Sequence, residues 1–171
     1  MKRIITQRSK VVLALAALVC TAGIVWATSP HFVTASGNAS GTNFVVCFKE
    51  SGLGDNALIS YEASASATAQ YVCINGGNNH PSATNKETVH GPVSAAGTFE
   101  SGKNGTISQC LTLKPPSAGS FSCPPGQTLA LACVEYTNID ITDTTNTVFE
   151  TVATDSGLLE SSSVAGQFCT L

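Results

Sequence analysis

The sequence predicts an all-β protein, an immunoglobulin-like antiparallel β-sandwich of about seven strands that is stapled by disulfides. Three observations predict this class. The stretch from Ala57 to Ile74 alternates strictly with period two, turn-forming residues recur about every ten positions, and six cysteines follow an apolar leader. No segment has a convincing helical pattern. The marker tryptophan of antibody domains is missing, because the only tryptophan, Trp26, lies in the leader.

The stretch from Ala57 to Ile74 is the strongest single element. Side chains on a strand point to opposite faces in turn, so its apolar residues would share one face and its Ser, Thr, Glu and Gln residues the other. A helix is the alternative, but helical spacing would scatter the polar residues through the apolar face, and no cap is present. The expected inner face is Ile59, Tyr61, Ala63, Ala65, Ala67, Ala69, Tyr71 and Cys73.

Residues 1–27 have the features of a secretory signal peptide. Four basic residues among the first ten precede an apolar run from Val11, and Val25-Trp26-Ala27 offers a cleavage site after Ala27. An uncleaved anchor is the alternative, although the apolar run is at the lower limit for a span of ~20 residues. Residues 28–42 are rich in Ser, Gly, Asn, Ala and Thr and predict a flexible lead-in, and residues 43–171 then form the β-sandwich domain.

The charge of the chain without its leader excludes several classes of partner. Only Lys49, Lys86, Lys103 and Lys114 remain against all eleven Asp and Glu, which gives a net charge of −7 and no arginine. Nucleic acids and anionic membrane surfaces are bound through clustered cations. We therefore expect no nucleic acid partner and no stable membrane anchor after signal cleavage.

The remaining strands follow from alternation and turn signals. In the first, Phe44, Val46 and Phe48 share one face. Pro92 marks a later strand as an edge or irregular strand, and the Asn-Gly pair at 104–105 predicts a hairpin turn after it. The expected strands, besides 57–74, are 43–50, 88–101, 106–114, 128–142, 147–153 and 164–171.

The strand expected at 128–142 changes phase partway along. Leu129 and Leu131 have one parity, whereas Val134 and Tyr136 have the other. A β-bulge near Ala132-Cys133 would absorb this shift, because a bulge inserts one extra residue into one strand of a pair.

The six cysteines of the exported chain predict three disulfides. Cys73 shares parity with Tyr71, and Cys123 with Phe121, so that this pair can meet in the core. Cys110 and Cys133 lie on consecutive strands, which predicts a cross-strand bridge, and Cys47–Cys169 would then join the first strand to the last. Metal ligation is the alternative, but no two of these cysteines have the C-x-x-C spacing of zinc sites.

Signals for catalysis and for cofactors are weak. No serine lies in a G-x-S-x-G frame, and His31, His80 and His90 have the pattern of surface histidines. The glutamates are dispersed, as on solvated strand faces, rather than paired as in glycosidases. Asp140 and Asp143 are weak candidates for a calcium site, but their spacing matches no EF-hand loop. We expect no catalytic residues, no metal site and no cofactor.

The most unusual surface segment follows the long strand. It is polar and glycine-rich, directly after Cys73, and loops of this kind on rigid sandwiches often bind partners. A simple strand connection is the alternative. The candidate binding residues are Asn75, Asn78, Asn79, His80 and Asn85.

Several short motifs lie along the chain between Tyr71 and Asn146. They are Tyr71-Val-Cys-Ile-Asn-Gly-Gly77, His80-Pro81, Asn85-Lys-Glu-Thr88, Gly91-Pro-Val93, Ser101-Gly-Lys-Asn-Gly105, Phe121-Ser-Cys-Pro-Pro-Gly-Gln127 and Asp143-Thr-Thr-Asn146. Together they resemble those of a family of short secreted proteins of Gram-positive bacteria. The resemblance covers about Phe44 to Val148 and implies no activity, because none is assigned to that family. It implies a disulfide between Cys73 and Cys123, in agreement with their parity, and the other four cysteines depart from the family's pattern.

Three functions are therefore weighed. The first is a secreted, non-catalytic β-sandwich protein that binds an extracellular partner or cell-surface polymer, is associated with the cell wall, or has a structural role in the envelope. The second is a secreted inhibitor or protein-interaction module that presents the 75–85 or the 115–127 loop. The third is a hydrolase, which would need a histidine, a carboxylate and a serine in one concave pocket. Exposed aromatic residues on one flat face would favour glycan binding.

Overall fold

The computed structural model describes residues 29–75, 85–152, 156–161 and 169. In this part of the chain it has eight strands and no helix with the length and apolar character needed to cross a membrane. The strands are β1 (His31–Ser40), β2 (Asn43–Ser51), β3 (Leu58–Asn75), β4 (Lys86–Glu100), β5 (Thr106–Leu113), β6 (Gln127–Asp143), β7 (Val148–Thr151) and β8 (Leu158–Glu160).

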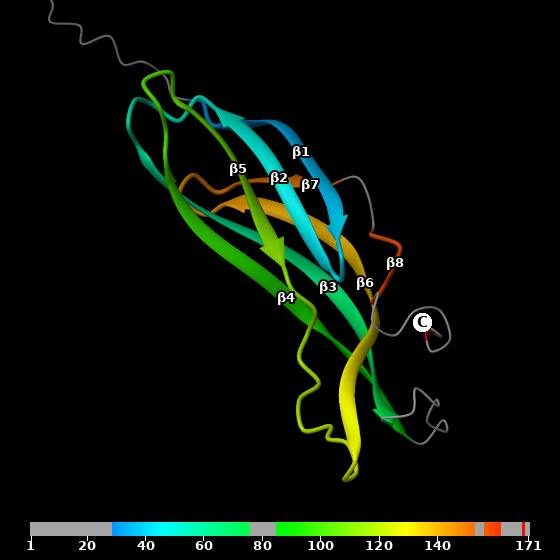
Figure 1. Ribbon diagram of the computed structural model, residues 1–171. Helices are drawn as coiled ribbons and strands as arrows, with labels where there is room; N and C mark the ends of the chain where they lie inside the picture. Colours follow the sequence, from blue (N-terminus) through cyan, green and yellow to red (C-terminus); the bar gives the residue numbers. More distant parts are fainter. Residues whose placement is uncertain (1–28, 76–84, 153–155, 162–168, 170–171) are drawn as a thin grey trace, which may run out of the picture.

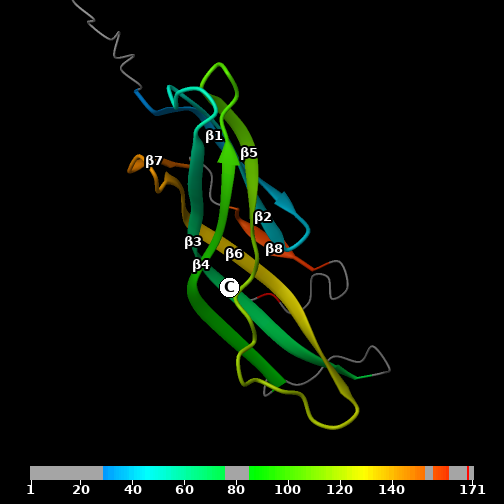
Figure 2. The same ribbon diagram turned by 90° about the vertical axis from the view of Figure 1, so that its left-hand side faces the viewer.

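The strands form two antiparallel sheets that pack face to face (Figures 1 and 2). We call the three-stranded sheet, of order β1-β2-β5, the small sheet, and the five-stranded sheet, of order β4-β3-β6-β7 with β8 also paired to β6, the large sheet. The predicted all-β, disulfide-stapled fold is confirmed, and its immunoglobulin-like topology stays a prediction. The long strands β3, β4 and β6 continue beyond the small sheet (Figure 1).

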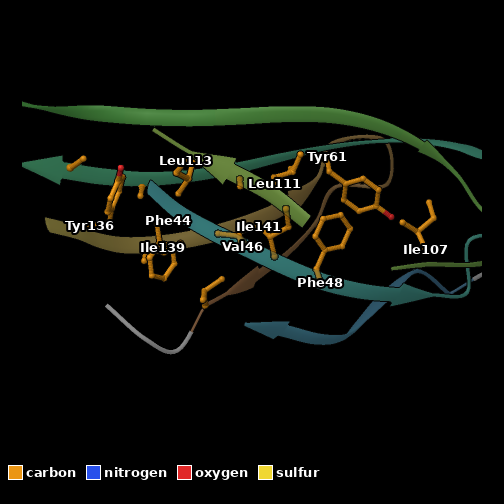
Figure 3. Packing of buried hydrophobic residues seen from close by; sticks show 14 of the residues in the cluster. Phe44, Val46, Phe48, Tyr61, Ile107, Leu111, Leu113, Tyr136, Ile139 and Ile141 are labelled. Atoms are coloured by element: carbon orange, nitrogen blue, oxygen red, sulfur yellow. The ribbon is translucent and has the colours of Figure 1, made fainter. Parts of the chain in front are cut away.

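Strand β3 is the centre of the large sheet and confirms the predicted alternation. It pairs with β4 along one side and with β6 along the other. Its apolar residues from Ile59 to Ala69 are buried. The alanines leave room for large aromatic side chains from the small sheet, so that the ring of Phe48 lies 4.5 Å from that of Tyr61 and the ring of Phe44 lies 5.9 Å from that of Tyr136 (Figure 3).

Strand β6 contains the predicted bulge and a second one. Cys133 pairs with Gln70 and Leu131 pairs with Tyr71, so Ala132 is the extra residue, as the change of phase predicts. A second irregularity lies at Asn138, whose φ is 51°. It shifts the phase again, and as a result Val134 and Tyr136 before it and Ile139 and Ile141 after it are all buried.

The predicted flexible lead-in is wrong, because most of residues 28–42 form the edge strand β1. This strand pairs with β2 from His31 to Ser40, and the ring of Phe32 packs edge-on against that of Phe48 at 6.0 Å. Its composition is misleading because an edge strand gains its backbone hydrogen bonds from the neighbouring strand and needs few apolar side chains of its own.

The predicted hairpin at residues 102–105 is also wrong. A tight turn is present, with the Gly105 amide donating to the Gly102 carbonyl at 2.9 Å. However, β4 before it belongs to the large sheet and β5 after it to the small sheet, so the turn joins the two sheets. The Asn-Gly signal fixes the local turn, but it does not decide with which strand the returning chain pairs.

The disulfides confirm one predicted pair and correct two. Cys73 is bonded to Cys123, as predicted, but Cys47 is bonded to Cys110 and Cys133 to Cys169. The predictions Cys110–Cys133 and Cys47–Cys169 are wrong because they treat consecutive strands as neighbours. Strand β5 belongs to the small sheet, where Cys110 lies directly opposite Cys47.

The end of the chain differs in part from the prediction. Strand β7 corresponds to the strand expected at 147–153, and β8 is an addition that sequence reasoning missed. The strand expected at 164–171 lies outside the described residues, except for Cys169.

Candidate binding surface on the large sheet

The outer face of the large sheet, which points away from the core, consists largely of small polar side chains. It follows from the polar half of the alternation in β3 and from the residues paired with it on β4 and β6. Neighbouring hydroxyls hydrogen-bond across the strands, as between Ser60 and Thr98 at 2.9 Å. We refer to this surface as the hydroxyl face. Its β3, β4 and β6 residues are Ser60, Glu62, Ser64, Ser66, Thr68, His90, Pro92, Ser94, Ala96, Thr98, Glu135, Thr137, Asp140 and Thr142.

One end of the hydroxyl face is hollowed into an open groove of about 500 Å³. Strands β3 and β6 provide its floor, and the 144–147 turn with β7 provides a wall. Five of its six lining residues offer a hydroxyl or a carboxylate, and the sixth is aromatic. They are Ser64, Asp140, Thr142, Thr144, Thr147 and Phe149.

The 144–147 turn is held by an Asx turn at its base. Both oxygens of the Asp143 carboxylate are used: Oδ1 accepts the amides of Thr145 and Asn146 at 2.8 and 2.9 Å, and Oδ2 accepts Nδ2 of Asn146 at 2.6 Å. Ser60 adds a second attachment, because its carbonyl accepts the amide and hydroxyl of Thr144 and its own amide donates to Oγ1 of Thr145. The wall of the groove is therefore positioned by hydrogen bonds on both sides.

Phe149 is the exposed aromatic residue of this surface. Its side chain is 69% exposed, although it lies on a paired strand beside Thr142. Leu58, which is 68% exposed, continues the same parity at the start of β3. A solvent-exposed aromatic ring beside a row of hydroxyls is typical of surfaces that bind amphipathic ligands.

The hydroxyl face is acidic. It carries Glu62, Asp140 and Glu135, and the rows from Ser60 to Thr68 with their described neighbours contain no lysine or arginine. Anionic polymers are poor partners for such a face, whereas neutral or amino-bearing ligands are compatible with it.

A smaller hollow of about 330 Å³ lies on the outer face of the small sheet, around the Cys47–Cys110 disulfide. Its lining includes Thr34, Ser36 and Ser108, but no charged side chain. Gln109 is a fourth polar residue of this lining, but in contrast to the groove beside Phe149 it has no exposed aromatic ring.

Asn75 and Asn85, the two described residues of the predicted binding loop, are distant from this groove. Asn75 ends β3, eleven residues beyond Ser64, which corresponds to ~36 Å along an extended strand. Asn85 donates to the side chain of Gln127 at 3.2 Å. Asn78, Asn79 and His80 lie outside the described residues, so this prediction stays open for them.

The other candidate residues are not brought together. His90 hydrogen-bonds Thr68 at 2.9 Å, and Nδ1 of His31 hydrogen-bonds the Ser29 carbonyl at 2.8 Å. Asp140 lies in the groove, whereas Asp143 is completely buried and faces the core. Within the described residues, no three His, Cys, Asp or Glu side chains are grouped as metal ligands.

A buried acidic site lies beneath the groove, and sequence reasoning missed it. Glu50 of β2 is 0% exposed, and among the described residues neither its two carboxylate oxygens nor the Tyr61 hydroxyl has a hydrogen bond of standard geometry. Tyr61 and Asp143 nevertheless lie near enough to act on it: burial, together with Asp143, raises the pKa of Glu50 to about 7, while the Tyr61 hydroxyl opposes this rise. Burial also raises the pKa of Tyr61. The signal was present in the sequence, because Glu50 shares the parity of Phe44, Val46 and Phe48.

The loop predicted at 115–127 spans residues 114–126 in the structure, between β5 and β6, and is attached to the large sheet at two points. The Cys73–Cys123 disulfide fixes its second half, and the Tyr71 hydroxyl donates to the Pro116 carbonyl at 2.6 Å in its first half. Between these points the loop is largely exposed, and it is thus a braced surface segment.

Comparisons with protein-family models, with curated proteins and with solved structures found no match to this chain.

Proposed function

We propose that this protein is a secreted, non-catalytic binding protein that attaches to an extracellular glycan through the groove on the hydroxyl face. The observation that carries the proposal is the exposed ring of Phe149 beside a groove lined by Ser, Thr and Asp side chains. The three disulfides indicate an oxidising, extracellular environment, and the predicted signal peptide is consistent with export.

The chemistry of the groove fits a sugar. An aromatic ring offers an apolar surface to the C–H face of a pyranose, while hydroxyls and a carboxylate exchange hydrogen bonds with its hydroxyl groups. Ser64, Thr142 and Asp140 supply such groups on one side of Phe149, and Thr144 and Thr147 on the other. The hydroxyl face continues from the groove along β3, so an extended chain of sugars has room to lie on it.

Charge narrows the class of glycan. Glu62 and Asp140 make the surface acidic, and the chain without residues 1–27 has a net charge of −7. Uronic-acid or phosphate-bearing polymers would be repelled. We therefore expect neutral glycans or glycans with free amino groups.

Co-sedimentation with insoluble polysaccharides tests this proposal. The purified protein should sediment with at least one of cellulose, chitin or chitosan, and Phe149→Ala should lower the association constant about tenfold. Val33→Ala is the matched control, because Val33 is also exposed but lies on β1 of the small sheet. Unchanged binding by Phe149→Ala, or no binding to any of the three, would contradict the proposal.

A second candidate is an inhibitor or interaction module that presents the 114–126 loop. The double attachment of this loop favours it, because protein-binding loops gain affinity from being held in one conformation. Secreted proteases inhibited by the purified protein, with loss of inhibition on Phe121→Ala and not on Phe149→Ala, would favour this function over glycan binding.

A further inference from the structure

Glu50 of the small sheet and Asp143 of the large sheet face the same buried space, because Phe48, on the same face of β2 as Glu50, has its ring 4.5 Å from that of Tyr61, the register partner of Asp143. Asp143 ends β6 of the large sheet and is the register partner of Tyr61, while Glu50 belongs to β2 of the small sheet. All three side chains are at most 1% exposed. In Figure 3 the Tyr61 hydroxyl points toward Ile107, which is the register partner of Glu50.

The two carboxyl groups are supported very unequally. Asp143 accepts the three donors of the 144–147 turn, while among the described residues neither oxygen of Glu50 has a hydrogen bond of standard geometry, and only Tyr61 and Asp143 itself lie near enough to interact with it as hydrogen-bonding groups. A second buried charge without a hydrogen bond is costly, and this cost disappears when the carboxyl group is protonated. Glu50 is thus stable in this position as a neutral acid, and its ionisation would place two negative charges in the same enclosed space.

Few other groups can offset such a charge. The titratable groups that act on Glu50 are His31 from β1, Tyr61 from β3 and Asp143 from β6. Strand β5 contributes Ile107 opposite Glu50. Among the described residues, positive charge near Glu50 can come only from His31, whose ring lies at the surface, and the Tyr61 hydroxyl is the other group that favours the ionised form.

We propose that the protonation state of Glu50 controls the 144–147 turn beside the groove. The turn is held in place when Glu50 is protonated and loosened when Glu50 ionises, and we call this arrangement the latch. The mechanical link is Asp143, because the carboxylate that an ionised Glu50 would repel is the group that holds the amides of Thr145 and Asn146. Thr144 and Thr147 of the same turn line the groove. The latch itself is a property of the fold, whereas its effect on ligand binding rests on the proposed function.

Hydrogen exchange of single amides tests the latch without any ligand. Between pH 5.5 and 8.5, after correction for the intrinsic pH dependence of exchange, protection of the Thr145 and Asn146 amides should fall about tenfold. In Glu50→Gln it should stay constant. The Gln127 amide is a matched control, since it donates to the Pro124 carbonyl in a turn remote from Glu50 and should not change.

A titration of the unmodified protein covers the case in which Glu50→Gln does not fold. The Glu50 carboxyl carbon is followed by NMR together with the Thr145 and Asn146 amide shifts. Coincident midpoints support the latch. A Glu50 titration that leaves both amides unchanged, or equal loss of protection in Glu50→Gln, would overturn it.

A binding experiment distinguishes failure of the latch from failure of the proposed function. The probe is a fully acetylated chitin oligosaccharide, which has no titrating group. Affinity that falls with rising pH in the unmodified protein and not in Glu50→Gln supports both ideas. If amide protection depends on pH but no Phe149-dependent glycan binding is found, only the proposed function is contradicted. If glycan binding depends on Phe149 but amide protection does not depend on pH, only the latch is contradicted.

Discussion

Cys47 and Cys110 lie directly opposite each other on β2 and β5, with their Cα atoms 4.0 Å apart. The two strands are also joined by continuous pairing from Phe44↔Leu113 to Ser51↔Thr106. In the folded protein the disulfide therefore connects strands that are already connected, and its main effect is on the unfolded chain.

Replacing both Cys47 and Cys110 by alanine should retain the fold and lower the free energy of unfolding. The bond closes a loop with a sequence separation of 63 residues, for which the chain-entropy model gives about 4 kcal/mol. Chemical denaturation with circular dichroism measures the change. Loss of the β-sheet spectrum in native buffer would show that the pairing of β2 with β5 depends on the bond.

The stability of the folded protein should decrease as the pH rises from about 4.5 to about 7. Burial raises the pKa of Glu50 from 4.5 to about 7, so the folded state holds a proton that the unfolded chain has released in this range. The stabilisation of the folded state by protonated Glu50 is complete below pH 4.5 and lost above about pH 7. It amounts to about 3 kcal/mol. Urea denaturation at several pH values measures it, and Glu50→Gln should remove this part of the pH dependence.

Two buried tyrosines should respond differently to loss of their hydroxyl groups. The Tyr136 hydroxyl donates to the Thr42 carbonyl at 2.9 Å, so Tyr136→Phe should cost about 1 kcal/mol. Among the described residues the Tyr61 hydroxyl has no hydrogen bond of standard geometry and has only the Glu50 carboxyl nearby to interact with, so Tyr61→Phe should cost less stability than Tyr136→Phe. Thermal unfolding of the two variants checks this, and equal losses would contradict the difference in hydrogen bonding.

Two strand glycines form a second matched pair. A Cβ atom at Gly37 would overlap the ring of Phe44, whereas at Gly91 it would meet nothing within 4 Å. Gly37→Ala should therefore cost about 1–3 kcal/mol through overpacking. Gly91→Ala should be neutral or stabilising, because alanine restricts the unfolded chain. Denaturation midpoints of both variants measure these changes in stability. A Gly37→Ala variant as stable as the unmodified protein would mean that the Phe44 ring can move aside.

The sequence predicts the elements whose pattern is decided locally. The alternation of β3, the apolar face of β2 with Phe44, Val46 and Phe48, and the bulge at Ala132 all follow from parity. Asn138 was missed because asparagine tolerates positive φ and is ordinary in a turn, so nothing marks it as a second bulge. Strand β1 was missed because its stabilising hydrogen bonds come from β2 and not from its own side chains.

The position of the groove could not be predicted from the alternation of residues along single strands, because it depends on which strands pair. The position of Phe149 beside Thr142 requires the pairing of β6 with β7, and the distance between Asn75 and the groove requires the full length of β3. The same reason explains the two wrong disulfides, since the assignment of β5 to the small sheet is a long-range property.

The turn at residues 102–105 has a consequence for how the chain folds. Because it carries the chain from one sheet to the other, the small sheet consists of residues 31–51 and 106–113, which are separated by the whole of the β3–β4 pair. Strands β3 and β4 can pair early, but β5 reaches β2 only after a long loop has closed, and such non-local pairing is slow. We expect refolding of the reduced chain to be slow for this reason, and oxidation before β5 has docked would leave Cys110 free to react with the wrong cysteine.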